Sequence, residues 1–183
     1  MECIICGTNK KESNIKTYNG NSLCLNCLSQ QESLVNEFSL KKSFSYPECD
    51  EIIQKKLYLG NYDFASDEKL LSKINISSIL VCGAELKCKF THKYNYLKLN
   101  LHDYEEDSLL PYIEKSVKFI ADNLSNGVFV HCNAGVSRSP SIIIAFLIKN
   151  YKYTYNAAYE YVKSKRKNIK PNDKFISELK KLK

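Results

Sequence analysis

Residues 131–139 hold a cysteine, five intervening residues and an arginine, and they read His-Cys-Asn-Ala-Gly-Val-Ser-Arg-Ser. A loop of this length can surround one phosphoryl group with backbone N–H donors while a cysteine lies at its floor. Such donors favour the thiolate form of Cys132, which is the nucleophilic form of the side chain. Arg138 can bind two oxygens of a phosphate at once. The pattern therefore predicts a phosphate-binding loop with a nucleophile in it.

The segments on either side of this loop are apolar. Residues 127–130 read Gly-Val-Phe-Val, which is typical of a short buried strand. Pro140 then opens an apolar run over residues 141–148, and proline suits the first turn of a helix. Strand, tight loop and buried helix would direct a helix N-terminus at a bound anion. Gly135 would let the loop turn without a side chain in the way.

The alternative for the loop is a buried structural cysteine beside a surface arginine. Of 27 basic residues only Arg138 and Arg166 are arginine, and the rest are lysine. In so lysine-rich a chain, an arginine at the required spacing argues against coincidence.

The loop resembles the signature of the cysteine-based protein phosphatases, and its form His-Cys-x-Ala-Gly-x-Ser-Arg-Ser is similar to that of the dual-specificity phosphatases. The resemblance extends to Leu57–Asn61, Ile76–Leu80 and Pro171–Leu179, and it covers about residues 50–183. It implies an α/β fold with a central, mostly parallel sheet flanked by helices.

The resemblance also implies roles for individual residues. Cys132 would attack phosphorus and form a phosphocysteine, and His131 would orient the loop and assist thiolate formation. Arg138 and the loop N–H groups would stabilise the equatorial oxygens, and Ser139 would donate to the sulfur as it leaves. The substrate-binding positions would be Asn133, Ala134, Gly135, Val136, Ser137 and Arg138. No metal is needed for either step.

A general acid is expected on a loop that reaches over the phosphate. The alternating residues 94–100 predict a strand, and the resemblance places the acid at the first aspartate after it, Asp103. Glu105, Glu106 and Asp107 crowd the same loop, where a solvated charge is the alternative for each. Asp107 could instead cap a helix over residues 108–124.

A second group of candidate functional residues lies near the N-terminus and consists of two Cys-x2-Cys pairs. Two such pairs supply four thiolates for a tetrahedral Zn²⁺ site of structural type. Two disulfides are the alternative, and a reduced catalytic thiolate argues against them. The predicted ligands are Cys3, Cys6, Cys24 and Cys27. The module could cover the catalytic domain or recruit a partner, protein or RNA.

Length and composition fit this division. The sequence predicts a zinc module with a linker helix over residues 1–45 and a phosphatase domain over residues 46–183. No apolar run is long enough to span a membrane, and the first residues show neither a secretory signal nor a myristoylation site. We expect a cytoplasmic or nuclear protein.

The net charge of +7 is concentrated after residue 148. The sequence predicts a helix over residues 154–166 that buries Ala157, Ala158, Tyr161 and Val162 and ends in a basic run. That run is either a solvated helix end, where cations complement the dipole, or a patch for anionic partners.

The loop carries no lysine, so a phosphoprotein substrate, with phosphotyrosine and phosphoserine or phosphothreonine, is favoured over a lipid. An RNA 5′-phosphatase and a noncatalytic phosphate-binding or recruitment module are the alternatives. Cys82 ends an apparent strand and is either a small core residue or a thiol that could protect Cys132 as a disulfide.

Overall fold

The computed structural model describes residues 15–18, 21–24 and 46–182. The chain divides into two compact units, residues 1–45 and 46–183, and each is described by itself. In the first unit, β1 (Ile15–Tyr18) and β2 (Asn21–Cys24) pair antiparallel, with Ile15 opposite Cys24. The predicted ligands Cys3, Cys6 and Cys27 lie outside the described residues, and only the backbone of Cys24 is described.

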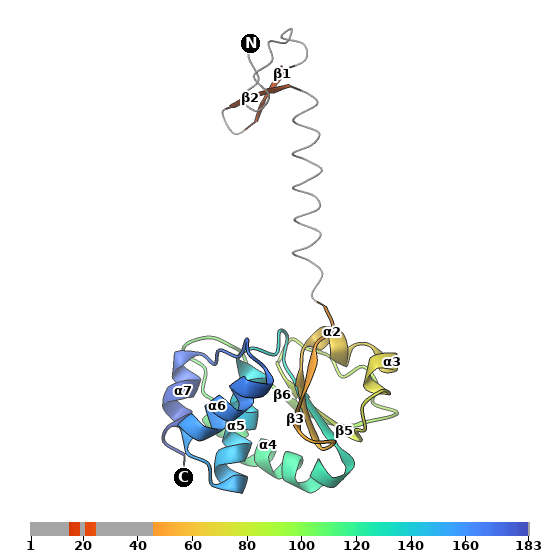
Figure 1. The fold of residues 1–183 in the computed structure, drawn as a ribbon, viewed down its shortest axis with the longest axis vertical. Coiled ribbons are helices and arrows are strands. Elements are labelled where there is room, and N and C mark those ends of the chain that lie inside the picture. Colours follow the sequence, from red (N-terminus) through yellow and green to blue (C-terminus); the bar gives the residue numbers. More distant parts are fainter. Residues whose placement is uncertain (1–14, 19–20, 25–45, 183) are drawn as a thin grey trace. The chain divides into compact units, whose positions relative to one another are not determined.

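The second unit is built on a five-stranded sheet with the order β3-β4-β7-β5-β6 (Figure 1). Only β3 is antiparallel to its neighbour; the pairs β4·β7, β7·β5 and β5·β6 are parallel. The predicted sheet of mostly parallel strands is confirmed. The strands are β3 (Cys49–Ile53), β4 (Leu57–Gly60), β5 (Ser78–Cys82), β6 (Asn95–Leu99) and β7 (Val128–His131).

Helices cover both faces of the sheet. Two short helices, α2 (Tyr62–Ala65) and α3 (Glu68–Leu71), pack on one face. The longer helices pack on the other face, as Figure 1 shows. They are α4 (Leu110–Asn123), which continues into the 3₁₀ turn η2 (Leu124–Asn126), α5 (Arg138–Tyr151), α6 (Tyr155–Lys165) and α7 (Asp173–Leu179). None of the described helices is long and apolar enough to cross a bilayer.

The central strands supply a core to each face because successive side chains point to opposite sides. In β7, Val128 and Val130 join the cluster under α4 and α5, whereas Phe129 joins the cluster under α2 and α3. All four residues of β7 and all five of β5 are buried, as expected for parallel strands covered on both sides. The loop after β7 therefore starts from the most constrained part of the fold.

Helix α5 begins at Arg138, two residues before Pro140, and everything from Arg138 to Ile148 is buried. The predicted sequence of strand, tight loop and buried helix is thus present. The loop lies at the carboxyl edge of the sheet, where Gly60 pairs with His131 across β4 and β7. Parallel strands gather their carboxyl ends at this edge, which is the usual place for ligands in α/β folds.

Asp107 does not cap the N-terminus of α4, although the sequence offered it as a possible cap. Asp107 accepts from the N–H of Tyr104, in its own loop, at 3.4 Å. The buried carboxylate of Glu178, from α7, instead accepts from the N–H of Leu109 at 2.7 Å and from the Ser108 hydroxyl at 2.9 Å. A carboxylate near the first turn also complements the helix dipole. A group 69 residues further along the chain therefore holds this helix end.

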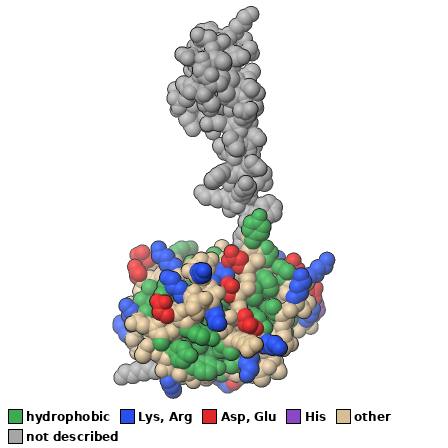
Figure 2. Space-filling view, viewed as in Figure 1, with side chains coloured by type: hydrophobic (Ala, Val, Ile, Leu, Met, Phe, Trp, Pro, Cys, Tyr) green, Lys and Arg blue, Asp and Glu red, His purple; other side chains and the backbone are tan. Residues whose placement is uncertain are grey.

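At helix α6 two parts of the prediction for residues 154–166 are wrong: the burial of Ala157 and the solvent exposure of Arg166. Ala158 and Val162 are buried and Tyr161 is half-buried, but Ala157 is exposed. The terminal Arg166 does not belong to a solvated basic end, because it is only 4% exposed. Figure 2 shows acidic side chains interspersed among the basic ones over this view of the domain.

Candidate active site

The sulfur of Cys132 lies at the floor of the loop and accepts two hydrogen bonds. The N–H of Gly135 and the hydroxyl of Ser139 each donate to Sγ, both at 3.2 Å. Cys132 is 2% exposed and Ser139 is fully buried. Two donors, one from the backbone and one from a side chain, therefore converge on this sulfur.

The backbone of the loop is fixed from several directions. Gly135 has a φ of 70°, and a Cβ at this position would lie 2.7 Å from the carbonyl oxygen of Gly60. Only glycine therefore fits, as the sequence predicted. The N–H of Tyr62 donates to the carbonyl of Asn133 at 2.9 Å, and the N–H of Lys170 donates to the carbonyl of Val136 at 2.8 Å. These carbonyls are bonded to groups outside the loop.

Arg138 opens α5 and is 7% exposed. Its Nη1 donates to the Glu85 carboxylate at 2.6 Å and to the carbonyl of Leu101 at 3.4 Å. Burial disfavours its charged form, but the bond to Glu85 and the negative charges of Cys132, Glu85 and Asp103 raise the pKa of Arg138 above its ordinary value. The guanidinium is thus held in one orientation.

One buried nitrogen of this guanidinium has no hydrogen-bond partner among the described residues. Nε of Arg138 is buried and makes no hydrogen bond with any residue that the structure describes. A buried charged donor without a partner is costly and requires an explanation. An anion bound in the loop would supply the missing acceptor.

Asp103 lies at the same pocket and is held by two donors. The Ser137 hydroxyl donates to Oδ1 at 2.7 Å, and the side-chain amide of Asn172 donates to the same oxygen at 2.9 Å. Ser137 also accepts from the N–H of Asn172 at 3.2 Å. Both donors bind Oδ1, so among the described residues Oδ2 remains available for another partner.

His131 is buried against aromatic rings at the end of β7. Its ring lies 5.6 Å from that of Phe129 and 6.0 Å from that of Tyr62, centroid to centroid. Burial first, and then the nearby charge of Arg138, lowers the pKa of His131 to about 4, against the raising effect of its bond to the Cys132 carbonyl. The ring is neutral at pH 7. It therefore orients the loop through Nδ1, 3.1 Å from the Cys132 carbonyl oxygen, rather than by charge.

The pocket above the sulfur has a volume of about 460 Å³. Of the predicted substrate-binding residues, Asn133, Ala134, Val136, Ser137 and Arg138 line it, together with Cys132 and Asp103. The segment between α6 and α7 contributes Lys170, Pro171 and Asn172, which sequence reasoning did not assign to the site. The pocket therefore contains a lysine, although the loop itself does not.

Glu85 and Arg166 are two further residues that sequence reasoning did not place at the site. Arg166 donates from Nε to the Gly135 carbonyl at 2.8 Å. The signal for it was present, because it is one of only two arginines among 27 basic residues. Glu85 offers no comparable signal, since it is one of 20 acidic residues in the chain.

Cys82 ends β5 and is fully buried in the same core cluster as Cys132. Burial, and then the negative charge of Cys132, raises the pKa of Cys82 well above its ordinary value. A protonated thiol attacks an oxidised sulfur poorly. This favours the packing role of Cys82, and its protective role stays a hypothesis.

Comparison with known proteins agrees with this geometry. Residues 57–183 match the family model described as dual specificity phosphatase, catalytic domain. The chain belongs to this family.

Among curated relatives, dual specificity protein phosphatase 1 of Arabidopsis thaliana is 32% identical over 82% of this chain and 77% of its own length. A probable rhodanese domain-containing dual specificity protein phosphatase of Dictyostelium discoideum is 34% identical over 74% of this chain, but over only 28% of its own length. The shared region is thus one part of some longer relatives.

Among solved structures, the human tyrosine phosphatase-like serine/threonine/tyrosine-interacting protein is similar, with a TM-score of 0.67 and 30% identity over 72% of this chain and 92% of that chain. The resemblance seen in the sequence is therefore confirmed for the phosphatase domain, and catalysis in this family uses a cysteine. The matched residues do not include the first 56, where the zinc ligands are predicted.

The buried neutral His131 predicts a pH dependence of stability. Its pKa is about 4 in the folded protein and near 6.5 in the unfolded chain, so the unfolded chain binds more protons between these values. The free energy of unfolding should fall as the pH drops through this window, by about 2 kcal/mol between pH 7.5 and pH 5.

Urea unfolding at both pH values tests this prediction. The His131→Asn variant should lose this part of the pH dependence, whereas His92→Asn, at an exposed position, should keep it. An unchanged pH dependence in His131→Asn would contradict the assignment.

Proposed function

We propose that the chain hydrolyses phosphotyrosine and phosphoserine or phosphothreonine in proteins through a phosphocysteine on Cys132. The unpartnered Nε of Arg138, buried at the same pocket as Cys132, is the observation that supports this most directly. It marks a place for an anion, and the nearby thiolate makes that anion a phosphoryl group under attack.

In the first step Cys132 attacks phosphorus in line and the leaving oxygen departs. Asp103 donates the proton that this oxygen needs, and Oδ2 is the atom that carries it because Oδ1 is bonded to Ser137 and Asn172. Arg138 and the loop N–H groups bind the three equatorial oxygens as charge spreads over them.

In the second step water attacks the phosphocysteine. Asp103, now a carboxylate, takes a proton from this water, and the sulfur leaves as a thiolate. The hydroxyl of Ser139, 3.2 Å from Sγ, donates to the departing sulfur. Each step moves one proton to or from Asp103, which returns to its starting form.

The charges that line the pocket favour a single phosphoryl group on a protein. The carboxylates that line the pocket outnumber the cations: the acidic residues are Asp103, Glu105 and Asp173, and the basic ones are Arg138 and Lys170. Ligands with several phosphates, such as an inositol lipid or a 5′-triphosphate, meet repulsion from these carboxylates. Lys170 can compensate for only part of it.

Phosphate release from four substrates tests this function. A phosphotyrosine peptide and its phosphothreonine counterpart should both be hydrolysed with a higher kcat/KM than an inositol phospholipid or 5′-triphosphorylated RNA. Cys132→Ser should release no phosphate from any of them, since a hydroxyl is a far weaker nucleophile.

A higher kcat/KM for the RNA or the lipid than for the peptides would contradict the proposal of a phosphoprotein substrate. If the wild-type protein released phosphate from none of the four substrates faster than Cys132→Ser does, the result would favour a noncatalytic phosphate-binding module.

For the N-terminal unit we propose a structural Zn²⁺ held by Cys3, Cys6, Cys24 and Cys27. The paired strands β1 and β2 follow the first cysteine pair, and β2 ends at Cys24 of the second pair, which suits a small unit stapled by metal. Four thiolates leave no open position, so the unit would have a structural or binding role, with a protein or an RNA as partner. A reduced thiolate at Cys132 favours a cytoplasmic or nuclear location.

Metal analysis of the purified chain should find one zinc per molecule. Cys3→Ser/Cys6→Ser should lose it, and Cys88→Ser should retain it as the matched control. Chelation should leave peptide hydrolysis intact because zinc takes no part in either step. A chain free of zinc after purification without chelators would contradict the site.

A further inference from the structure

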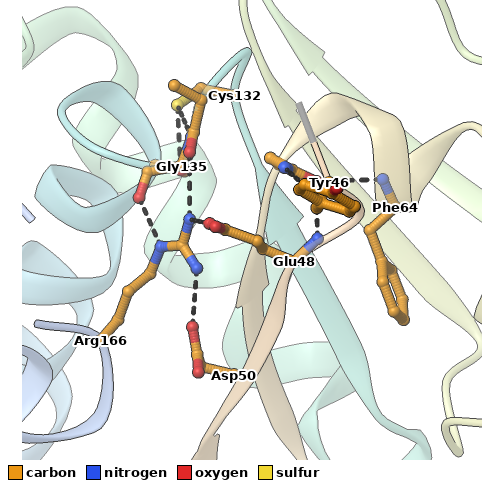
Figure 3. Close-up of polar contacts among 10 residues, drawn as sticks. Tyr46, Glu48, Asp50, Phe64, Cys132, Gly135 and Arg166 are labelled. Carbon is orange, nitrogen blue, oxygen red and sulfur yellow. Dashed lines mark hydrogen bonds and ion pairs between the residues drawn. The ribbon is translucent and has the colours of Figure 1, made fainter. Parts of the chain in front are cut away.

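Arg166 follows the last residue of α6, and its guanidinium is buried beneath the phosphate loop. Nε donates to the Gly135 carbonyl at 2.8 Å and Nη2 donates to the Ala134 carbonyl at 3.1 Å. Figure 3 shows the guanidinium on the side of the loop opposite to the sulfur of Cys132. One side chain thus binds two successive carbonyls of the loop.

Two carboxylates hold this guanidinium from its other edge. Nη1 donates to Asp50 at 2.7 Å and Nη2 pairs with Glu48, and both acids belong to the segment around β3 (Figure 3). Glu48 is itself fixed, since its N–H donates to the side chain of Asn61 at 3.0 Å and its carbonyl accepts from the N–H of Asn61 at 3.1 Å. Every nitrogen of the guanidinium has at least one partner, so its plane cannot rotate freely.

The contacts on Ala134 and Gly135 bear directly on the nucleophile. The carbonyl of Ala134 and the N–H of Gly135 belong to one peptide group, which is trans. In a trans peptide these two groups point in opposite directions. Arg166 holds the carbonyl end, and the N–H end donates to Cys132 Sγ at 3.2 Å.

The next peptide group repeats the arrangement. Its carbonyl, from Gly135, accepts from Nε of Arg166, so its N–H, from Val136, points to the opposite side. Val136 lines the pocket above the sulfur. A cation on a carbonyl also polarises the peptide and strengthens its N–H as a donor.

We propose that Arg166 is a positioning residue for the nucleophile: it turns two successive peptide N–H groups toward Cys132 and the bound phosphoryl group and strengthens both as donors. The proposal rests on the role proposed for Cys132. Lysine could not replace Arg166 fully, because an ammonium lacks the planar fork that reaches two carbonyls and two carboxylates together.

Alkylation of Cys132 by iodoacetate tests the proposal without requiring turnover. Only the thiolate reacts, so Arg166→Met should slow alkylation at pH 6 by about tenfold, the loss expected when a bond to a charged group weakens. At pH 9, where an ordinary thiol is largely ionised, the rate should change little. For peptide hydrolysis kcat should fall, and Arg166→Lys should restore only part of both losses.

Removal of Arg166 leaves Glu48 and Asp50 without a counter-charge and could unfold the domain. The triple variant Arg166→Met/Glu48→Gln/Asp50→Asn removes those charges, so it should regain stability and keep the slow alkylation. Lys167→Met, an exposed neighbour with the same loss of charge, should behave like the wild type.

Wild-type alkylation at pH 6 in the triple variant would overturn the proposal, as would equal slowing in Lys167→Met. If peptide hydrolysis failed in the wild type as well, the proposed function would fall, but the alkylation result would still decide the role of Arg166.

Discussion

The N–H of Gly135 donates to the sulfur of Cys132, and the elements on both sides of the loop keep this bond in place. Gly135 must have a positive φ, and the Gly60 carbonyl lies where any side chain would be. The position of the sulfur is fixed, because Cys132 directly follows β7, and every residue of β7 is buried. Helix α5 begins a few residues later and is also buried, so both ends of the loop are fixed while its N–H groups stay available to a ligand.

The charges around the loop follow a simple division. The two arginines of the chain are both buried at the loop, and each is paired with acidic residues from distant segments. Arg138 keeps one buried nitrogen unpartnered within the described residues, whereas all nitrogens of Arg166 are partnered. Arg138 is thus prepared to bind a ligand and Arg166 to hold the loop. Lysine carries the rest of the positive charge, at positions where geometry matters less.

Much of the site could be predicted from local sequence. The loop with Cys132, its flanking strand and its flanking helix follow from spacing and periodicity over short stretches, whereas Ser139 and Asp103 were assigned through the resemblance to the phosphatase family. Contacts between distant segments could not be predicted in this way. Glu178 binds the N-terminus of α4 from 69 residues away, so the predicted cap by Asp107 was wrong. Asp50 pairs with Arg166 across 116 residues, so the prediction of a solvated Arg166 was wrong as well. Periodicity reports which face of an element is apolar, but not which polar group will meet it.

The most direct test of this account is the isolation of the phosphocysteine itself. p-Nitrophenyl phosphate has a leaving group that needs no proton, so Asp103→Asn should impair mainly the hydrolysis of the intermediate. Acid quenching followed by mass spectrometry should then find phosphate on the peptide that contains Cys132, at higher occupancy in Asp103→Asn than in the wild type or in Glu105→Gln. Phosphate on another residue, or equal occupancy in Asp103→Asn and Glu105→Gln, would contradict the account.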